Sequence, residues 1–135
     1  VTNWTGTGAT VAKDTDAGDS PEMGTQSLSV ATTAANGYAQ SATFRVDGNL
    51  TYQMWVDVRA PAATGRVTVR DITNGADLVN DSWANGDWGT IDLSFTPGAS
   101  VDQIAIRLGA DENGATVHFD NVILLQSGRQ TYGLP

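Results

Sequence analysis

Apolar and polar side chains alternate over residues 50–59. Successive side chains of a β-strand point to opposite sides of a sheet, so one side of this segment is apolar and the other carries mostly polar side chains. The apolar side carries Leu50, Tyr52, Met54, Val56 and Val58, and the other carries Thr51, Gln53, Trp55, Asp57 and Arg59. The pattern predicts a half-buried strand with a tryptophan among polar groups on its outer face.

Similar short segments follow one another along most of the chain. They cover residues 10–13, 27–30, 39–46, 66–70, 90–95, 101–108 and 116–125, and a polar segment over residues 71–89 is predicted to be a long loop. Seven or eight short strands about ten residues apart, separated by Gly, Pro and Asn turns, are typical of a β-sandwich or a barrel. We interpret them as two packed antiparallel sheets.

Length and composition narrow the classes of function. At 135 residues, we expect one domain over residues 1–125 and a polar linker or docking arm over residues 126–135. A net charge of −8 disfavours nucleic acid and anionic membranes as partners. The absence of cysteine excludes disulfides and thiolate zinc sites. This composition favours a secreted, extracellular protein or a virion surface protein.

The sequence offers little catalytic chemistry. His118 is the only histidine, and the sequence shows no Ser-His-Asp set, paired zinc-binding histidines or phosphate-binding glycine loop. Most carboxylates lie in loops where solvation keeps the pKa of a carboxyl near its ordinary value. We therefore expect a non-catalytic protein.

The sequence offers more residues suited to binding than to catalysis, and they lie on the predicted strand over residues 50–59. An indole offers an apolar plate to the C–H face of a sugar, and planar polar side chains beside it can bond the hydroxyls. The predicted ligand-binding set is Trp55, Gln53, Asp57 and Arg59, with Arg107 as a neighbour on the same sheet face and Trp83 as a second platform. Trp83 fits core packing equally well, and Trp4 and Tyr38 are expected to cover the end of the core.

The order of several segments resembles a known family. Trp4, residues 24–30 (GTQSLSV), 38–40 (YAQ), 48–52 (GNLTY), 88–96 (WGTIDLSFT) and 119–122 (FDNV) are similar to segments of galactose-binding-like jelly-roll carbohydrate-binding modules, the type found beside xylanases and glucanases. The resemblance implies an antiparallel jelly-roll β-sandwich of about eight strands that binds a polysaccharide or glycan. The family's opening strand has no counterpart before Trp4, so that strand is either truncated or supplied by a partner.

The resemblance also implies a structural calcium ion. It places Asp120 among the ligands, with oxygens from Gly24 and Thr25 and from Asp19 or Glu22. Calcium takes six to eight oxygen ligands, so a carboxylate beside a glycine-rich acidic loop is chemically suitable. The alternative is that Asp120 caps a turn or pairs with an arginine.

A second class of function remains open. The same sandwich serves as a structural or adhesive domain of large assemblies, such as phage capsid decoration or tail proteins. In that case Trp55 and the arginines would anchor a protein interface, including one between copies in a homo-oligomer.

Overall fold

The computed structural model describes residues 3–14 and 26–126 of the chain. These residues form eleven strands: β1 (Trp4–Thr7), β2 (Ala9–Asp14), β3 (Ser27–Thr32), β4 (Tyr38–Ser41), β5 (Phe44–Arg45), β6 (Tyr52–Arg59), β7 (Gly65–Asp71), β8 (Ala76–Trp83), β9 (Gly89–Phe95), β10 (Gln103–Ala110) and β11 (Thr116–Gln126). The segment from residue 127 onward, most of the predicted linker or docking arm, lies outside the described residues. No helix in the described part of the chain is long and apolar enough to cross a membrane.

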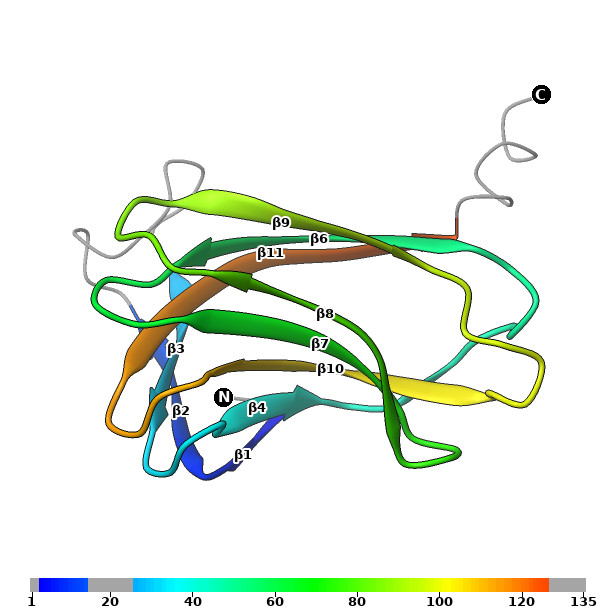
Figure 1. Ribbon diagram of the computed structural model, residues 1–135, viewed down its shortest axis with the longest axis horizontal. Helices are drawn as coiled ribbons and strands as arrows, with labels where there is room; N and C mark the ends of the chain where they lie inside the picture. The colour runs from blue at the N-terminus through cyan, green and yellow to red at the C-terminus, as the bar shows by residue number, and fades with distance from the viewer. Residues whose placement is uncertain (1–2, 15–25, 127–135) are drawn as a thin grey trace.

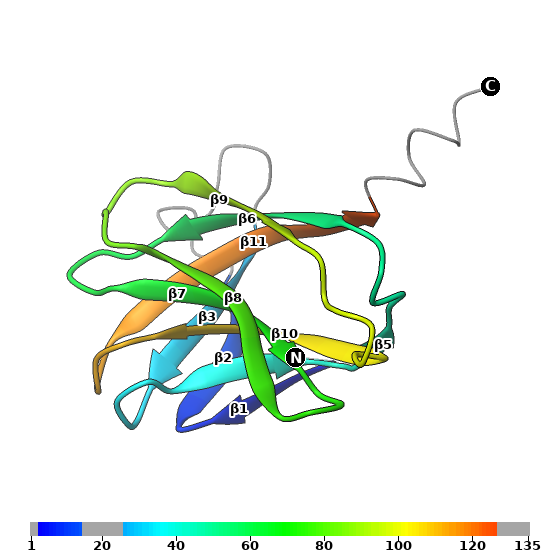
Figure 2. The same ribbon diagram turned by 45° about the vertical axis from the view of Figure 1, so that its right-hand side comes forward.

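The strands form two antiparallel sheets that pack face to face (Figure 1). The six-stranded sheet has the order β1-β4-β10-β7-β8, with β5 also paired to β10 (Figure 2). The five-stranded sheet has the order β2-β3-β11-β6-β9. This arrangement confirms the predicted all-β jelly-roll sandwich, although it has more strands than the eight or so expected.

The core lies between the two sheets. Along β6 the even-numbered residues from Tyr52 to Val58 are buried, while Gln53, Trp55, Asp57 and Arg59 are only partly so. The opposite sheet contributes Val67 and Val69 of β7 and Ile104, Ile106 and Leu108 of β10, and β11 adds Val117 and Phe119. Burial of this apolar surface is the main source of stability, at about 25 cal/mol per Å².

Two of the predicted boundaries were wrong. Residues 71–89 are not one long loop, because Ala76–Trp83 within this segment form β8, an edge strand of the six-stranded sheet. Its side chains are mostly exposed on both sides, so it lacks the alternation that marks a half-buried strand. Residues 39–46 form two strands, β4 and β5, instead of one.

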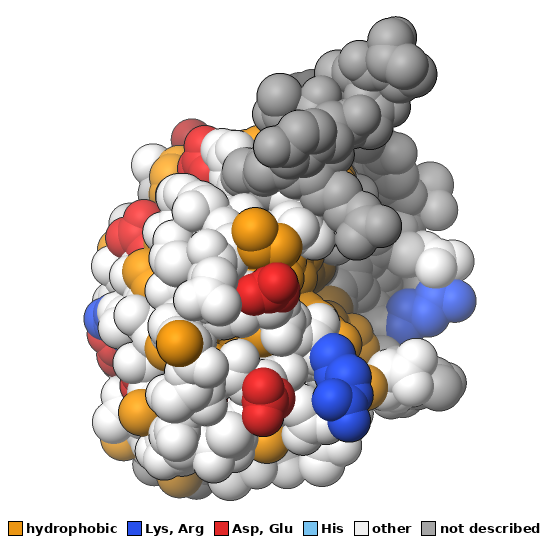
Figure 3. Space-filling view, turned by 90° about the vertical axis from the view of Figure 1, so that its right-hand side faces the viewer, with side chains coloured by type: hydrophobic (Ala, Val, Ile, Leu, Met, Phe, Trp, Pro, Cys, Tyr) orange, Lys and Arg blue, Asp and Glu red, His pale blue; other side chains and the backbone are white. Residues whose placement is uncertain are grey.

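A bulge divides β11 into two halves. Residues 116–119 pair with β3 and residues 118–120 pair with β6, whereas residues 123–126 pair only with β6. The register shifts between Asp120 and Ile123, and Asn121 adopts a left-handed backbone conformation with φ of 49°. Val122 and Ile123 are the large hydrophobic residues exposed in the described part of the chain. Viewed from the end where the second half of β11 finishes, the surface shows hydrophobic side chains among acidic and basic ones (Figure 3).

Candidate functional site

Trp55 lies on the outer face of the five-stranded sheet, as the alternation predicts. Its neighbours across the sheet are Asp92 on β9 and Ile123 on β11, and Ile123 is 48% exposed. The half-buried indole therefore sits between a carboxylate and an exposed aliphatic side chain. This surface is a platform with one polar and one apolar border.

The polar groups around Trp55 are largely bonded to one another. Gln53 Nε2 donates to Asp92 Oδ1 at 3.0 Å. The two carboxylate oxygens of Asp57 accept hydrogen bonds from Thr90 Oγ1 at 2.8 Å and Asn121 Nδ2 at 2.7 Å. Arg59 Nε donates to the carbonyl oxygen of Gly86 at 2.7 Å. These bonds hold the platform rigid and leave fewer of its groups for a ligand.

Arg107 and Trp83 do not join this platform. Arg107 lies on β10 in the six-stranded sheet, so the prediction that it shares a face with Trp55 was wrong. Strand periodicity gives the side of a strand but not the sheet to which it belongs. Trp83 ends β8, packs against the core and against Gly89, and its Nε1 donates to the carbonyl oxygen of Asp87 at 3.2 Å. Its role as a sugar platform stays a prediction.

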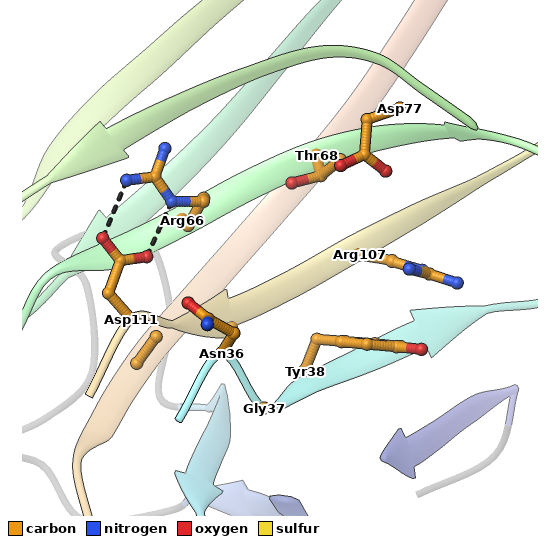
Figure 4. Close-up of a pocket in the computed structure, with 10 residues that line it drawn as sticks. Asn36, Gly37, Tyr38, Arg66, Thr68, Asp77, Arg107 and Asp111 are labelled. Atoms are coloured by element: carbon orange, nitrogen blue, oxygen red, sulfur yellow. Dashed lines mark hydrogen bonds and ion pairs between the residues drawn. The ribbon is translucent and has the colours of Figure 1, made fainter. Parts of the chain in front are cut away.

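The outer face of the six-stranded sheet holds a pocket with a volume of about 320 Å³ (Figure 4). Its lining includes Tyr38, Arg66, Thr68, Asp77, Arg107 and Gly109, together with Asn36 and Asp111. Gly109 lies between Tyr38 on β4 and Arg66 on β7 in the register of the sheet. Because glycine has no side chain, the backbone of Gly37 and Tyr38 can approach β10 closely at this point.

An arginine lies flat on a tyrosine at one side of this pocket. The Arg107 guanidinium carbon is 4.1 Å from the centre of the Tyr38 ring, a cation–π geometry. Arg107 Nε donates to Gln40 Oε1 at 2.8 Å. Two contacts from β4 thus fix the guanidinium, which Figure 4 shows beside Thr68 and Asp77.

An ion pair forms the opposite side. Arg66 Nε and Nη2 donate to the two carboxylate oxygens of Asp111, each at 2.7 Å, and Nη1 donates to Asn80 Oδ1 at 2.8 Å. The hydrogen bonds from Arg66 lower the pKa of the Asp111 carboxyl below its usual value. The pair is therefore charged at neutral pH, and its hydrogen bonds hold both side chains in place along this side of the pocket. The Tyr38 hydroxyl and the Thr68 hydroxyl have no hydrogen-bond partner among the described residues, and both remain available to a ligand.

Most of these pocket residues were not among the predicted site residues. Tyr38 was expected to cover the core, yet in the Tyr38-Ala39-Gln40 segment Ala39 is the buried residue. The same period-two argument that placed Trp55 outside would have placed Tyr38 and Gln40 outside too. Asn36 and Asp111 lie in loops, where periodicity carries no information.

The predicted calcium ligands fall mostly outside the described residues, since Asp19, Gly24 and Thr25 all lie there. Asp120 is described, at the β11 bulge, and its Oδ1 accepts a hydrogen bond from the Asn121 backbone nitrogen at 2.8 Å. Over residues 3–14 and 26–126, no group of three or more acidic, His or Cys side chains could hold a metal ion. One carboxylate alone does not make a calcium site.

The chain was compared with known proteins. No protein-family model and no curated protein matches it. The C-terminal family 22 carbohydrate-binding module of Clostridium thermocellum Xyn10B superposes with a TM-score of 0.74 at 19% identity, covering 95% of this chain and 88% of that one. The fold is that of a carbohydrate-binding module. The xylan-binding domain of Paenibacillus barcinonensis Xyn10C gives a TM-score of 0.68 at 17% identity, with 92% and 85% covered.

Some structures with this module fold are parts of much larger proteins. The enzymatically active domain of bacteriophage CBA120 tailspike protein 4 has a TM-score of 0.66 at 16% identity, and the alignment covers 93% of this chain but 19% of that one. The chain likewise spans 26% of a Clostridium thermocellum xylanase structure solved with xylohexaose. At such low identity these comparisons confirm the predicted carbohydrate-binding-module fold, and function has to be argued from the site.

Proposed function

We propose that this chain is a non-catalytic polysaccharide-binding module whose ligand lies in the pocket on the outer face of the six-stranded sheet. The observation that carries the proposal is the convergence of polar groups on one pocket, namely Arg107, the pair of Arg66 with Asp111, and the hydroxyl of Thr68, which has no partner among the described residues. The carbohydrate-binding modules that share the fold support it.

The chemistry of the pocket suits a sugar. Its volume falls within the range of roughly 300–1,000 Å³ that is usual for small-ligand sites. Sugar hydroxyls both donate and accept, and the pocket presents donors from arginine together with acceptors from Asp77 and Asp111. Each hydrogen bond exchanged with water contributes only about 1 kcal/mol, so we expect affinities in the micromolar to millimolar range.

Affinity electrophoresis with soluble xylan, β-glucan and mannan tests the proposal. We expect at least one polymer to retard the protein, and Tyr38→Ala to weaken that retardation about tenfold, because the variant removes the ring that supports Arg107. Trp55→Ala is the matched control, since it removes an aromatic ring from the other sheet. Loss of retardation in Trp55→Ala alone would move the site to the platform predicted from the sequence. No retardation by any of these neutral polymers, together with no binding of the acidic oligosaccharides described below, would refute the proposal.

We further propose that the module acts outside the cell or on a virion, where polysaccharides are accessible. A calcium ion held by Asp120 with Asp19, Gly24 and Thr25 is part of the same proposal. In it, Asp120 would supply the carboxylate and calcium would tie the β11 bulge to the acidic loop. Asp120 Oδ1 is engaged by Asn121, so Oδ2 is the oxygen available for the ion.

A second candidate function is a contact surface in a larger assembly. It is favoured by the cross-strand pairing of half-buried Trp55 with Ile123, which is 48% exposed. Trp is a frequent anchor of protein interfaces, and exposed apolar patches often mark them. In sedimentation experiments, self-association that is lost in Ile123→Asp would support this function, and a monomer at all concentrations would argue against self-association.

A further inference from the structure

The arginines on the outer face of the six-stranded sheet differ in how their charge is balanced. Arg66 pairs with Asp111 at 2.7 Å, and Arg70 pairs with Asp77 at 2.8 Å. Arg107 contacts the Tyr38 ring and the neutral amide of Gln40, and no carboxylate among the described residues lies within ion-pair distance of it. The pocket therefore contains one cation without a counter-charge.

The contacts of Arg107 leave most of its donors unused. A guanidinium carries five N–H groups, and the bond to Gln40 occupies the one on Nε. The N–H groups on Nη1 and Nη2 have no acceptor among the described residues, and the ring of Tyr38 fixes the plane in which they lie. Two parallel N–H groups at a fixed orientation match the two oxygens of a carboxylate, the geometry of a bidentate pair.

Acidic groups dominate the rest of the protein, whose net charge is −8. Repulsion between this charge and an anionic ligand is screened beyond roughly 8 Å at physiological ionic strength. The contact at Arg107 is local and escapes much of that screening, because the side chain is partly buried against the sheet. A neutral sugar has no need of an uncompensated cation, whereas an acidic sugar does.

We propose, on the basis of the function proposed above, that the ligand carries a uronic acid and that Arg107 binds its carboxylate through Nη1 and Nη2. Arg66 and Asp111 then serve the neutral hydroxyls, since their charges already neutralise each other. The carboxylate belongs either to a uronic acid side group on a neutral backbone or to a backbone made of uronic acids.

Isothermal titration with short oligosaccharides tests this inference and avoids the long-range repulsion of a polyanion. The probes are a xylo-oligosaccharide that bears one glucuronic acid, the same compound with its carboxyl reduced to an alcohol, and an oligogalacturonate. We expect the wild type to bind an acidic probe about tenfold more tightly than the carboxyl-reduced compound. Arg107→Gln should abolish that difference, and Arg107→Lys should keep only part of it. Lys13→Gln, which removes a positive charge from β2 in the other sheet, should leave it intact.

The outcomes separate the two proposals. Equal affinity of the wild type for the acidic and reduced compounds would overturn the uronic acid inference and leave polysaccharide binding standing. A preference that survives in Arg107→Gln would also overturn it. Preference for the substituted xylo-oligosaccharide would assign the carboxylate to a side group, and preference for the oligogalacturonate to the backbone. If the protein binds none of these probes and none of the neutral polymers above, the proposal of polysaccharide binding itself is refuted.

Discussion

Gly109→Ala probes a close contact between two backbone segments that line the pocket. A Cβ atom at residue 109 would overlap the carbonyl oxygen of Gly37 and would lie 3.0 Å from both Cα and Cβ of Tyr38. These are mostly backbone atoms, so no side-chain rotation can relieve the overlap, and the start of β4 has to move away from β10. That movement also weakens the hydrogen bond from the Ala110 nitrogen to the Gly37 oxygen, which is 3.2 Å long.

The expected loss follows from these two effects. Overpacking of a tight site costs about 1–3 kcal/mol, and the strained hydrogen bond about 1 kcal/mol more, so we expect the free energy of unfolding to fall by about 2–4 kcal/mol. With a urea m-value of about 2 kcal/mol/M, the midpoint of urea unfolding drops by about 1–2 M. Tryptophan fluorescence measures this midpoint, and ligand affinity should fall in parallel, because Tyr38 moves with β4.

Gly86→Ala is the matched control. Its added Cβ would lie 3.8 Å from Pro61, an ordinary contact, and we expect a change within about 0.5 kcal/mol. A Gly109→Ala midpoint equal to that of Gly86→Ala would refute the claim that close approach of the Gly37 backbone requires glycine here.

Three further predictions concern the core, acid stability and calcium. Phe119→Ala should lower the free energy of unfolding by about 3–5 kcal/mol in urea titrations, because Phe119 is fully buried, whereas Ile123→Ala on the same strand should change it by less than about 1 kcal/mol. Because the pKa of Asp111 is lowered in the folded protein, its pairing with Arg66 stabilises the fold above the unfolded-state pKa of about 3.9 and is lost as pH falls below that value. Asp111→Asn should therefore flatten the acid limb of a plot of melting temperature against pH, and an unchanged limb would contradict the assignment. If Asp120 helps to bind calcium, a chelator should lower the melting temperature of the wild type and leave Asp120→Asn unaffected; a wild type that does not respond would argue against the ion.

The strands that alternate cleanly were the ones that could be predicted. Over β6 the period of two placed each side chain correctly, including the outward Trp55. β8 was missed because an edge strand with polar groups on both sides has no periodic signal. A register shift between Val69 and Arg70 of its partner β7 interrupts the pairing as well.

The pocket could not be predicted from the period of two, because its residues come from several strands. Its walls come from β4, β7, β8 and β10 and from two loops, and only the strand order brings them together. Arg107 was correctly chosen as an outward residue, but its partners Tyr38 and Gln40 lie more than sixty residues earlier in the chain. Periodicity within one segment carries no information about such neighbours.

The position of β11 also governs when the protein can fold. This last described strand lies in the interior of its sheet, between β3 and β6. The two strands therefore become part of one sheet only when β11 has paired with both. During synthesis the ribosome must release residues up to about Gln126 before the five-stranded sheet can close. A nascent chain that ends before this strand would expose the apolar faces of β3 and β6 and would be a target for chaperones and proteases.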